Sequence, residues 1–132
     1  MRVLFVCTGN AFRAPVAEAL LKKLKSGIEV DSAGTNPSTH VSEDARKYLA
    51  RENAEQYLKN IPEGLNSKRL DMYDLIIVMK PEHKDAVLSK CLECKGKIVV
   101  WNIDDPYFLP SGHAEKIFAQ IRNKVVKLAG SL

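Results

Sequence analysis

A nucleophile and several anion-binding groups lie close together near the start of the chain. Cys7 follows the apolar run 3–6, Gly9 and Asn10 come next, and Arg13 stands six positions after the cysteine. Backbone N–H groups between the end of a strand and the start of a helix lack partners and can bind an oxyanion. An arginine adds two parallel donors, and the positive field favours a thiolate. This spacing therefore predicts covalent phosphoryl transfer through Cys7.

Each of these residues alone also fits an ordinary structural role. A cysteine after a buried strand is usually a small core side chain, and Gly-Asn is a common turn. Arg13 on its own is compatible with a surface ion pair. The complete string, placed between a strand and a helix, is much more specific than any one of its members.

Alternating strands and helices are predicted to position these groups. Apolar runs predict strands at 3–6, 28–31, 74–79 and 97–101. Helical patterns cover 15–25, 41–58, 81–89 and 113–128, with Ser42 as the expected N-cap of the second. Strands that alternate with helices imply right-handed crossovers and a parallel sheet. We therefore predict an α/β fold with a four-stranded parallel sheet flanked by helices on both faces, in the flavodoxin-like arrangement.

This sheet brings a second candidate group to the cysteine. Open parallel sheets bind ligands beyond the carboxyl ends of their strands. Cys7 and Asp105 both lie just after predicted strands, so both are expected at that edge. A carboxyl group there can act as a general acid and then as a general base. Without Cys7 beside it, Asp105 in its Asp-Pro pair is an ordinary turn residue.

Length and composition limit the classes of protein that fit. The chain has 132 residues, enough for one domain over 1–132, and a net charge of +4. This mild charge suits an anionic substrate, and no basic stripe with interleaved aromatic residues predicts binding to nucleic acid. The first apolar run is too short for a signal peptide or a membrane span, and three cysteines do not predict a disulfide framework. We expect a cytoplasmic protein without membrane association, a monomer or a weak dimer.

Three motifs spread over nearly the whole chain carry a family resemblance. They are Val-Cys-Thr-Gly-Asn-Ala-Phe-Arg-Ala-Pro at 6–15 with Ala-Glu at 17–18, Asp-Ser-Ala at 31–33, and Asp-Pro-Tyr at 105–107. The chain resembles the low-molecular-weight protein tyrosine phosphatases, whose signature is Val-Cys-x-Gly-Asn-x-x-Arg-Ser-Pro. The match is loose between about residues 37 and 69. The resemblance implies the phosphotyrosine phosphatase I-like fold and hydrolysis of phosphotyrosine in protein substrates and of small aryl phosphates.

The resemblance also implies a role for each residue of the first motif. Cys7 attacks phosphorus and forms a phosphocysteine, and Asp105 protonates the leaving oxygen and then activates water. Arg13 binds the phosphate together with backbone N–H groups of the loop. The expected phosphate-binding loop residues are Thr8, Gly9, Asn10, Ala11, Phe12 and Ala14. Because Arg13 and the amides supply the positive field, no metal or cofactor is expected.

Further residues match family positions around the site. Tyr107 and Phe108 are expected at the pocket mouth, where they suit a phenyl phosphate, with ordinary loop packing as the alternative. Asn10 and Ser32 resemble residues that hold the phosphate loop in shape by hydrogen bonds, with local turn bonding as the alternative. Glu18 also matches a family position, and helix solubility is its simpler role.

The chain departs from the family pattern at two loop positions. Ala14 replaces a serine or threonine whose hydroxyl donates to the cysteine sulfur, so we expect a raised pKa of Cys7 and slower turnover. Phe12 stands where many members have a second, protective cysteine. Cys91 and Cys94 form a Cys-x-x-Cys pair further on. A structural disulfide or two inert thiols are favoured there over a redox pair, because the pair precedes a strand.

Several functions stay open beside tyrosine phosphatase. An arsenate reductase of similar fold needs a relay cysteine after the third strand, where this chain has Lys80. A phosphoarginine phosphatase tends to carry threonine where this chain has Ala11, which decides neither way. The lost hydroxyl at position 14 also allows a phosphate-binding module with weak catalysis. His40, His83 and His113 form no sequence-local group with Cys7 and are interpreted as surface or capping residues.

Overall fold

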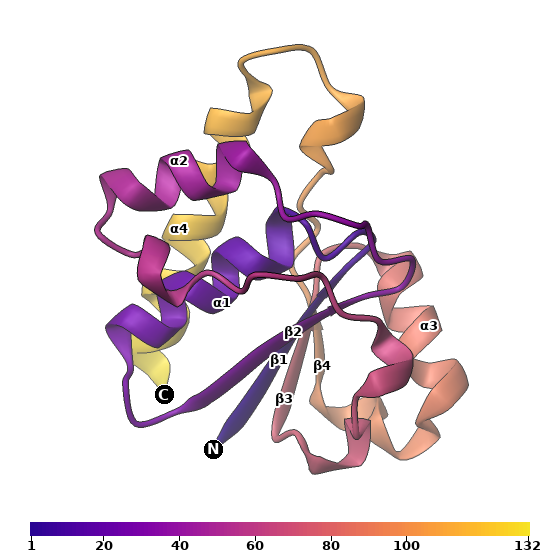
Figure 1. The fold of residues 1–132 in the computed structure, drawn as a ribbon. Helices are drawn as coiled ribbons and strands as arrows, with labels where there is room; N and C mark the ends of the chain where they lie inside the picture. The colour runs from indigo at the N-terminus through magenta and orange to yellow at the C-terminus, as the bar shows by residue number, and fades with distance from the viewer.

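A four-stranded parallel sheet forms the centre of the molecule. The computed structural model describes residues 1–132, and its strands are β1 (Arg2–Cys7), β2 (Glu29–Gly34), β3 (Leu75–Val78) and β4 (Ile98–Val100). They lie in the order β2-β1-β3-β4, and each neighbouring pair is parallel (Figure 1). The chain leaves β1 toward one edge and β3 toward the other. The loops after β1 and β3 therefore flank the point where ligands bind in folds of this kind.

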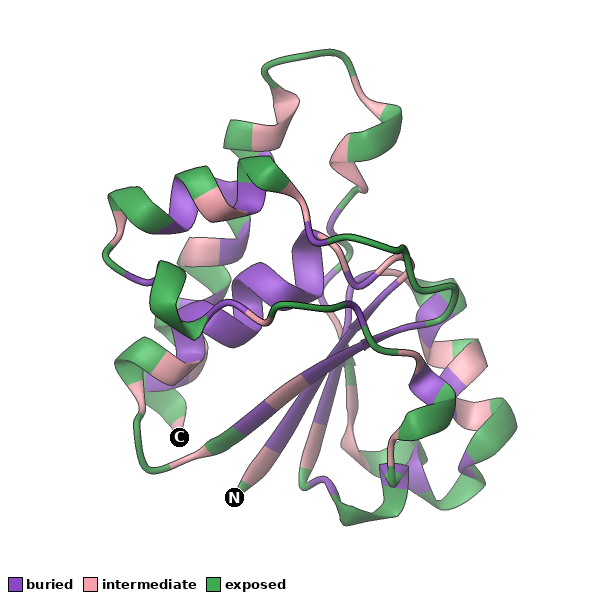
Figure 2. Ribbon diagram, in the orientation of Figure 1, coloured by how far each residue is buried: buried purple, intermediate pink, exposed green.

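Helices cover both faces of this sheet (Figure 1). On one face lie α1 (Arg13–Leu24) and α4 (His113–Ser131), with α2 (Glu43–Arg51) packed beside them; α3 (Pro81–Lys90) covers the other. Val3 and Phe5 of β1 join the core under α1 and α4, whereas Leu4 and Val6 join the core under α3. This alternation buries both faces of β1 (Figure 2) and confirms the predicted fold class.

Three of the differences between the observed and the predicted element boundaries have a clear cause. Strand β2 continues to Gly34, because 32–34 pair with 5–7 of β1. Helix α1 begins two residues earlier than predicted, since the Val16 N–H already donates to the carbonyl of Phe12. Helix α2 ends at Arg51 rather than near residue 58: Asn53 takes a positive φ of 55°, and a 3₁₀ turn follows at Glu55–Tyr57.

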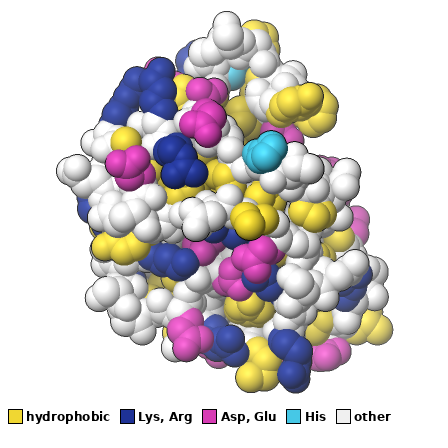
Figure 3. All heavy atoms as spheres, viewed as in Figure 1, with side chains coloured by type: hydrophobic (Ala, Val, Ile, Leu, Met, Phe, Trp, Pro, Cys, Tyr) yellow, Lys and Arg dark blue, Asp and Glu magenta, His cyan; other side chains and the backbone are white.

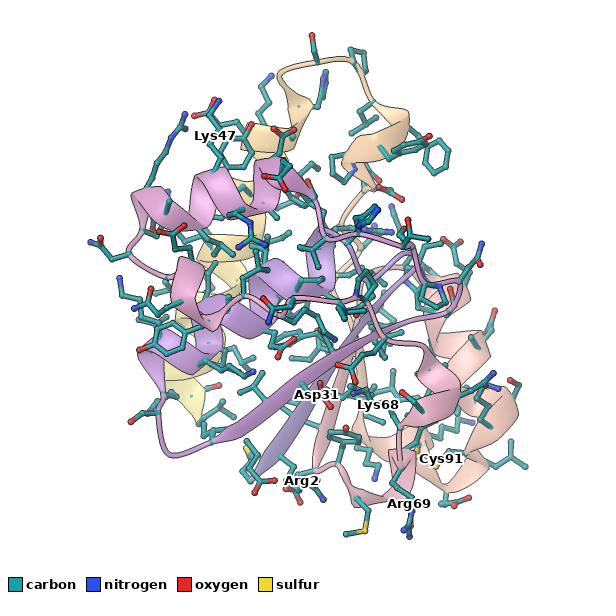
Figure 4. The ribbon with its side chains drawn as sticks, viewed as in Figure 1. Arg2, Asp31, Lys47, Lys68, Arg69 and Cys91 are labelled. Atoms are coloured by element: carbon teal, nitrogen blue, oxygen red, sulfur yellow. A yellow bond between two sulfur atoms is a disulfide. The ribbon has the colours of Figure 1, made fainter.

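Two further features concern the ends of helices. Ser42 is the N-cap of α2 and accepts a hydrogen bond from the Ala45 N–H at 3.3 Å, as the sequence predicts. Cys91 and Cys94 form a disulfide at the end of α3. Helix α3 runs antiparallel to the strands. The disulfide at its C-terminal end therefore lies near the end of the sheet where the strands begin, away from their carboxyl ends (Figure 4).

None of the helices combines the length and the apolar character that crossing a membrane requires.

Candidate active site

The loop between β1 and α1, residues Cys7 to Arg13, curls around a sulfur atom; we call it the cysteine loop. The thiol of Cys7 is buried and accepts hydrogen bonds from the backbone N–H groups of Asn10 and Ala14. Ala14 lies in the first turn of α1, where N–H groups have no partner within the helix. The positive end of this helix therefore points at the sulfur.

Close packing and one left-handed residue fix the path of the cysteine loop. Asn10 has a φ of 52°, a conformation that asparagine adopts more readily than most residues. Gly9 does not take a positive φ; a glycine is needed there for space. A Cβ atom on Gly9 would lie 2.6 Å from Ser38 Oγ, and one on Gly34 would lie 2.5 Å from the Thr8 carbonyl oxygen. The segment after β2 therefore presses directly on the loop.

Arg13 joins the cysteine loop to a second loop, residues Asn102 to Gly112, which we call the acid loop. Its guanidinium is buried, and Nη1 donates to the Ile103 carbonyl at 2.8 Å. Nη2 lies 3.4 Å from Thr8 Oγ1 and 3.5 Å from Asp105 Oδ2. The alternative of a surface ion pair is therefore wrong for Arg13. A buried guanidinium in this position offers its fork to an anion that enters between the two loops.

A buried polar network holds Asn10 from both ends of its amide. Nδ2 donates to Ser32 Oγ at 2.9 Å, and Oδ1 accepts from Lys59 Nζ at 2.8 Å and from the Glu63 N–H at 2.7 Å. Ser32 Oγ in turn donates to the carboxylate of Glu18. All of these partners are remote in sequence, so the bonds are not local turn bonds. They fix the left-handed residue of the cysteine loop against β2 and α1.

His83, at the start of α3, reaches the cysteine loop from the other face of the sheet. Its Nε2 lies 2.8 Å from Thr8 Oγ1, and its Nδ1 accepts from the Lys80 N–H at 3.0 Å. The capping role predicted for His83 is correct, but the surface position is wrong, because the ring is 1% exposed. His40 is exposed and His113 half-buried at the start of α4.

A cavity of about 500 Å³ lies between the cysteine loop and the acid loop. Its lining includes most of the site residues that the sequence indicates, namely Cys7, Thr8, Gly9, Ala11, Phe12, Arg13, Asp105, Tyr107 and Phe108. Asn10, Ala14 and Ser32 are not among the lining residues; they are fully buried. The cavity can hold a phosphoryl group against the sulfur and still admit a ring-sized leaving group.

The mouth of the cavity carries both aromatic and acidic side chains. Tyr107 is 85% exposed and Phe108 78% exposed, and their rings meet edge to face with centroids 5.1 Å apart. Figure 3 shows hydrophobic side chains on the loop that projects at the top of the molecule. Asp44 of α2 also lines the cavity and is exposed. The mouth thus offers a flat apolar surface and a carboxylate to whatever the phosphoryl group is attached to.

Two neighbouring carboxylates differ in what they face. Asp105 lines the cavity, and its Oδ1 accepts from the Tyr107 N–H at 3.0 Å. Asp104 lies outside and forms an ion pair of 2.6 Å with Lys80, whose ammonium lowers the pKa of Asp104. Asp104 is therefore held as a carboxylate, and Asp105 is the carboxyl group available to the cavity.

Burial raises the pKa of the Cys7 thiol above its ordinary value. The Arg13 guanidinium and the backbone N–H groups of Ala14 and Asn10 act in the opposite direction, and Asp105 adds to the rise. The raised pKa agrees in direction with the expectation drawn from the missing hydroxyl at Ala14, although burial is its main cause. No group of three or more His, Cys, Asp and Glu side chains is placed to hold a metal ion.

Four residues of the site escaped the sequence analysis in part or entirely. Lys59 lies in a stretch without a motif, and no signal in the sequence marks it. Glu18 was assigned helix solubility, but it is buried with an ion pair to Lys22, and only its family position pointed to it. Asp44 lies in the first turn of α2, where an acidic side chain is common and does not by itself indicate a site. His83 follows Lys80-Pro81 at the third helical position, a pattern typical of a capping side chain, but nothing local indicates Thr8 as its partner.

A buried cysteine wrapped by amides, with an arginine and a carboxyl group beside it at the carboxyl ends of a parallel sheet, is the arrangement expected of a small α/β phosphatase. The family model described as low molecular weight phosphotyrosine protein phosphatase matches residues 2–132. The chain belongs to this family, and it is a hydrolase that acts as a protein phosphatase.

Individual relatives show the spread within the family. The chain is 28% identical over 127 residues to the low molecular weight protein-tyrosine-phosphatase Etp of Escherichia coli, covering 90% of this chain and 86% of Etp. It is 34% identical over 99 residues to a protein-arginine-phosphatase of Geobacillus stearothermophilus, covering 73% of this chain and 66% of that protein. The crystal structure of a low molecular weight protein tyrosine phosphatase from T. tengcongensis superposes with a TM-score of 0.88 at 28% identity, covering 100% of this chain and 99% of the other.

Proposed function

We propose that the protein hydrolyses phosphotyrosine in protein substrates, and small aryl phosphates, through a phosphocysteine on Cys7. The sulfur of Cys7 forms a bond to phosphorus as the bond from phosphorus to the tyrosine oxygen breaks. Asp105 gives its proton to that leaving oxygen, so tyrosine departs neutral. Water then attacks the phosphocysteine, Asp105 takes back a proton, and inorganic phosphate leaves with the thiolate restored.

One observation carries this proposal: the buried sulfur of Cys7 and the carboxyl of Asp105 line the same cavity, joined by Arg13. Arg13 Nη2 lies 3.5 Å from Asp105 Oδ2, and the Cys7 sulfur already accepts two backbone N–H groups. An anionic phosphate placed against Arg13 competes with the Asp105 carboxylate for the guanidinium. It therefore favours the protonated carboxyl, which is the form that the first step needs.

The reaction does not require Cys7 to be a thiolate before the substrate binds. A thiol with a dianionic phosphate has the same net charge as a thiolate with a monoanionic phosphate. The raised pKa of Cys7 therefore fits a transfer of the thiol proton to the incoming phosphate. Arg13 and the amides of the cysteine loop then stabilise the negative charge that is shared between sulfur and phosphate.

Hydrolysis of para-nitrophenyl phosphate without added metal tests the proposal. We expect activity in the wild type, none in Cys7→Ser, and a loss of roughly 10²- to 10⁴-fold in Asp105→Asn. Asp104→Asn is the matched control, since Asp104 pairs with Lys80 outside the cavity, and its activity should stay close to that of the wild type. An inactive wild type, or a Cys7→Ser variant that retains activity, would show that the proposed function is wrong.

Phosphoarginine is a second candidate substrate, favoured by one feature of the rim. Asp44 and Asp105 place two carboxylates around the cavity, which suits a cationic guanidine as leaving group, and two relatives are named protein-arginine-phosphatases. The aromatic pair Tyr107 and Phe108 instead suits a phenol ring, and for this reason we place phosphotyrosine first. Competition between a phosphotyrosine peptide and a phosphoarginine peptide, compared by kcat/KM, decides between them.

Arsenate reduction has less support. Relay chemistry needs a second thiol within reach of Cys7. Cys91 and Cys94 are paired with each other at the far end of α3, on the opposite edge of the sheet (Figure 4). Thioredoxin-coupled reduction of arsenate is therefore expected to be undetectable.

A further inference from the structure

His83 is a buried histidine that the proposed reaction does not use. It projects from the first turn of α3 and meets the side chain of Thr8 in the cysteine loop, with 2.8 Å between Nε2 and Thr8 Oγ1. Thr8 follows the nucleophile directly and lines the cavity. The contact joins the helix on one face of the sheet to the phosphate loop at its edge.

The other ring nitrogen of His83 decides which way the proton in this contact points. Nδ1 accepts a hydrogen bond from the Lys80 N–H at 3.0 Å, so Nδ1 carries no proton. In a neutral imidazole the proton is then on Nε2. His83 therefore donates to Thr8 Oγ1 and does not accept from it.

Burial, more than the neighbouring charges, keeps the ring of His83 neutral. Burial, with Arg13 and Lys80 acting in the same direction and Asp105 against them, lowers the pKa of His83 to about 4. Between pH 5 and pH 8 the ring thus keeps the same tautomer and the same direction of donation.

Thr8 Oγ1 already accepts two hydrogen bonds, and this leaves its own proton free. One bond comes from His83 Nε2, and the other from Arg13 Nη2 at 3.4 Å. A hydroxyl oxygen has two acceptor positions and one proton, so the proton must point away from both donors. The hydrogen-bond donors to the Cys7 sulfur are the backbone N–H groups of Asn10 and Ala14. The open direction for the Thr8 proton is therefore the cavity that the residue lines.

We propose that the Thr8 hydroxyl donates a hydrogen bond to an oxygen of the phosphoryl group in the cavity, and that His83 is the positioning residue that turns this hydroxyl toward it. The inference rests on the proposed function only in placing a phosphoryl group there. It adds a side-chain donor to the amides of the cysteine loop. It also gives α3 a part in phosphate binding.

Two matched pairs of variants separate this role from a purely structural one. Thr8→Val removes the hydroxyl and keeps the branched shape, whereas Thr8→Ser keeps the hydroxyl. His83→Asn keeps an acceptor near the Nδ1 position for the Lys80 N–H and loses the donor to Thr8. His83→Gln keeps a donor near the Nε2 position and loses the cap of α3. If His83 only caps α3, the His83→Gln variant should therefore lose more phosphate affinity than the His83→Asn variant.

The affinity for inorganic phosphate, measured by calorimetry, is the primary readout because it does not depend on turnover. Since a hydrogen bond to a charged group is at stake, Thr8→Val should bind phosphate roughly ten- to a hundredfold more weakly. His83→Asn should lose a smaller factor, and His83→Gln and Thr8→Ser should retain most of the affinity. In a Thr8→Val background, His83→Asn should have almost no further effect.

The rate of alkylation of Cys7 by iodoacetate against pH is the second readout. Its midpoint should stay the same in Thr8→Val and Thr8→Ser, because the hydroxyl serves the phosphate and not the sulfur. Wild-type phosphate affinity in Thr8→Val overturns the proposal, and so does a loss in His83→Gln larger than that in His83→Asn. An inactive wild type that binds phosphate in this pattern would instead count against the proposed hydrolysis alone.

Discussion

In the cysteine loop the polar side chains are held by partners from β2, from α3 and from the segment after α2, whereas the acid loop presents its aromatic side chains to solvent. Asn10 contacts Ser32 and Lys59, and Thr8 contacts His83. By contrast, the rings of Tyr107 and Phe108 are exposed and meet edge to face. The Asp105 carboxylate accepts a local N–H two residues away and lies 3.5 Å from Arg13 Nη2. The anion-binding half of the site is therefore held by buried hydrogen bonds before substrate arrives, whereas the half that carries Asp105 presents exposed side chains.

This division follows from what each half must do. A donor set for an anion works best when its dipoles are already oriented, because no reorganisation is then needed during the reaction. The group that meets the leaving side chain must adapt to different protein substrates, and loops on a rigid scaffold suit this task. Arg13 contacts Thr8 in one half and Ile103 and Asp105 in the other, so it links the two halves directly.

The largest effect is expected from removing the cation inside the network of the cysteine loop. The Lys59 side chain is almost buried and bonds Asn10, Ser32 and Glu63. Lys59→Met should cost about 3 kcal/mol in the free energy of unfolding, because buried polar partners lose their charge-assisted bonds. Urea unfolding at neutral pH measures it, with the exposed Lys47→Met of α2 (Figure 4) as control. Equal stabilities of the two variants would contradict the rigid network.

The second effect is a decrease in the free energy of unfolding at acidic pH, which originates at His83. Its folded pKa of about 4 lies below the unfolded value of 6.5, so the unfolded chain binds the proton more readily. The contribution of neutral His83 is present above pH 6.5 and is lost as the pH falls toward 4. Between pH 7 and pH 5 the loss should be about 2 kcal/mol. Unfolding by urea at both pH values checks it, and His83→Gln should show a smaller difference between them. The same difference in both proteins would show that other groups cause it.

The third effect concerns the thiol itself. Ala14→Ser should place a hydroxyl beside the sulfur, add a donor to the thiolate and lower the pKa of Cys7. We expect the rate of alkylation by iodoacetate at pH 6 to rise roughly three- to tenfold, and turnover of para-nitrophenyl phosphate to rise as well. An unchanged alkylation profile would mean that the side chain at position 14 does not influence the pKa of Cys7.

The smallest effect is expected at the exposed aromatic pair. Tyr107→Ala should leave the free energy of unfolding within about 0.5 kcal/mol of the wild type, as is usual for exposed side chains. The KM for a phosphotyrosine peptide should rise a few-fold, because a stacked aromatic pair contributes about 0.5–1.5 kcal/mol. Inhibition by inorganic phosphate should not change. A large loss of stability would show that the acid loop is not the loosely held half.

The sequence predicted some features of the site well and missed others, and the missed ones lie mainly around the cysteine loop. The fold class, the N-cap at Ser42 and the clustering of Cys7, Arg13 and Asp105 followed from periodicity and from one rule about parallel sheets. They depend on local pattern or on strand order, and both are visible in a single chain. The partners of the cysteine loop were harder to find. Lys59 and His83 act through contacts across 49 and 75 positions of sequence, and no local pattern reports such contacts.

Helix α2 shows the same limit on a smaller scale. Its charged helical pattern continues past Arg51, and only the left-handed turn at Asn53 ends it. In that turn the Ala54 N–H returns to the carbonyl of Leu49. Propensity alone does not distinguish this turn from a further helical turn, because tertiary packing decides between them.

The most direct test of the two-part site is to separate the first chemical step from the second. The Asp105→Asn variant is mixed with para-nitrophenyl phosphate, quenched in acid and examined by intact-protein mass spectrometry. Para-nitrophenolate leaves without help from an acid, while the water step still needs the missing base. We therefore predict that one phosphoryl group accumulates on Cys7 in Asp105→Asn, and that Cys7→Ala shows none. If Asp105→Asn still turns over substrate but never carries a phosphoryl group on Cys7, the account of a rigid anion site with a covalent first step is wrong.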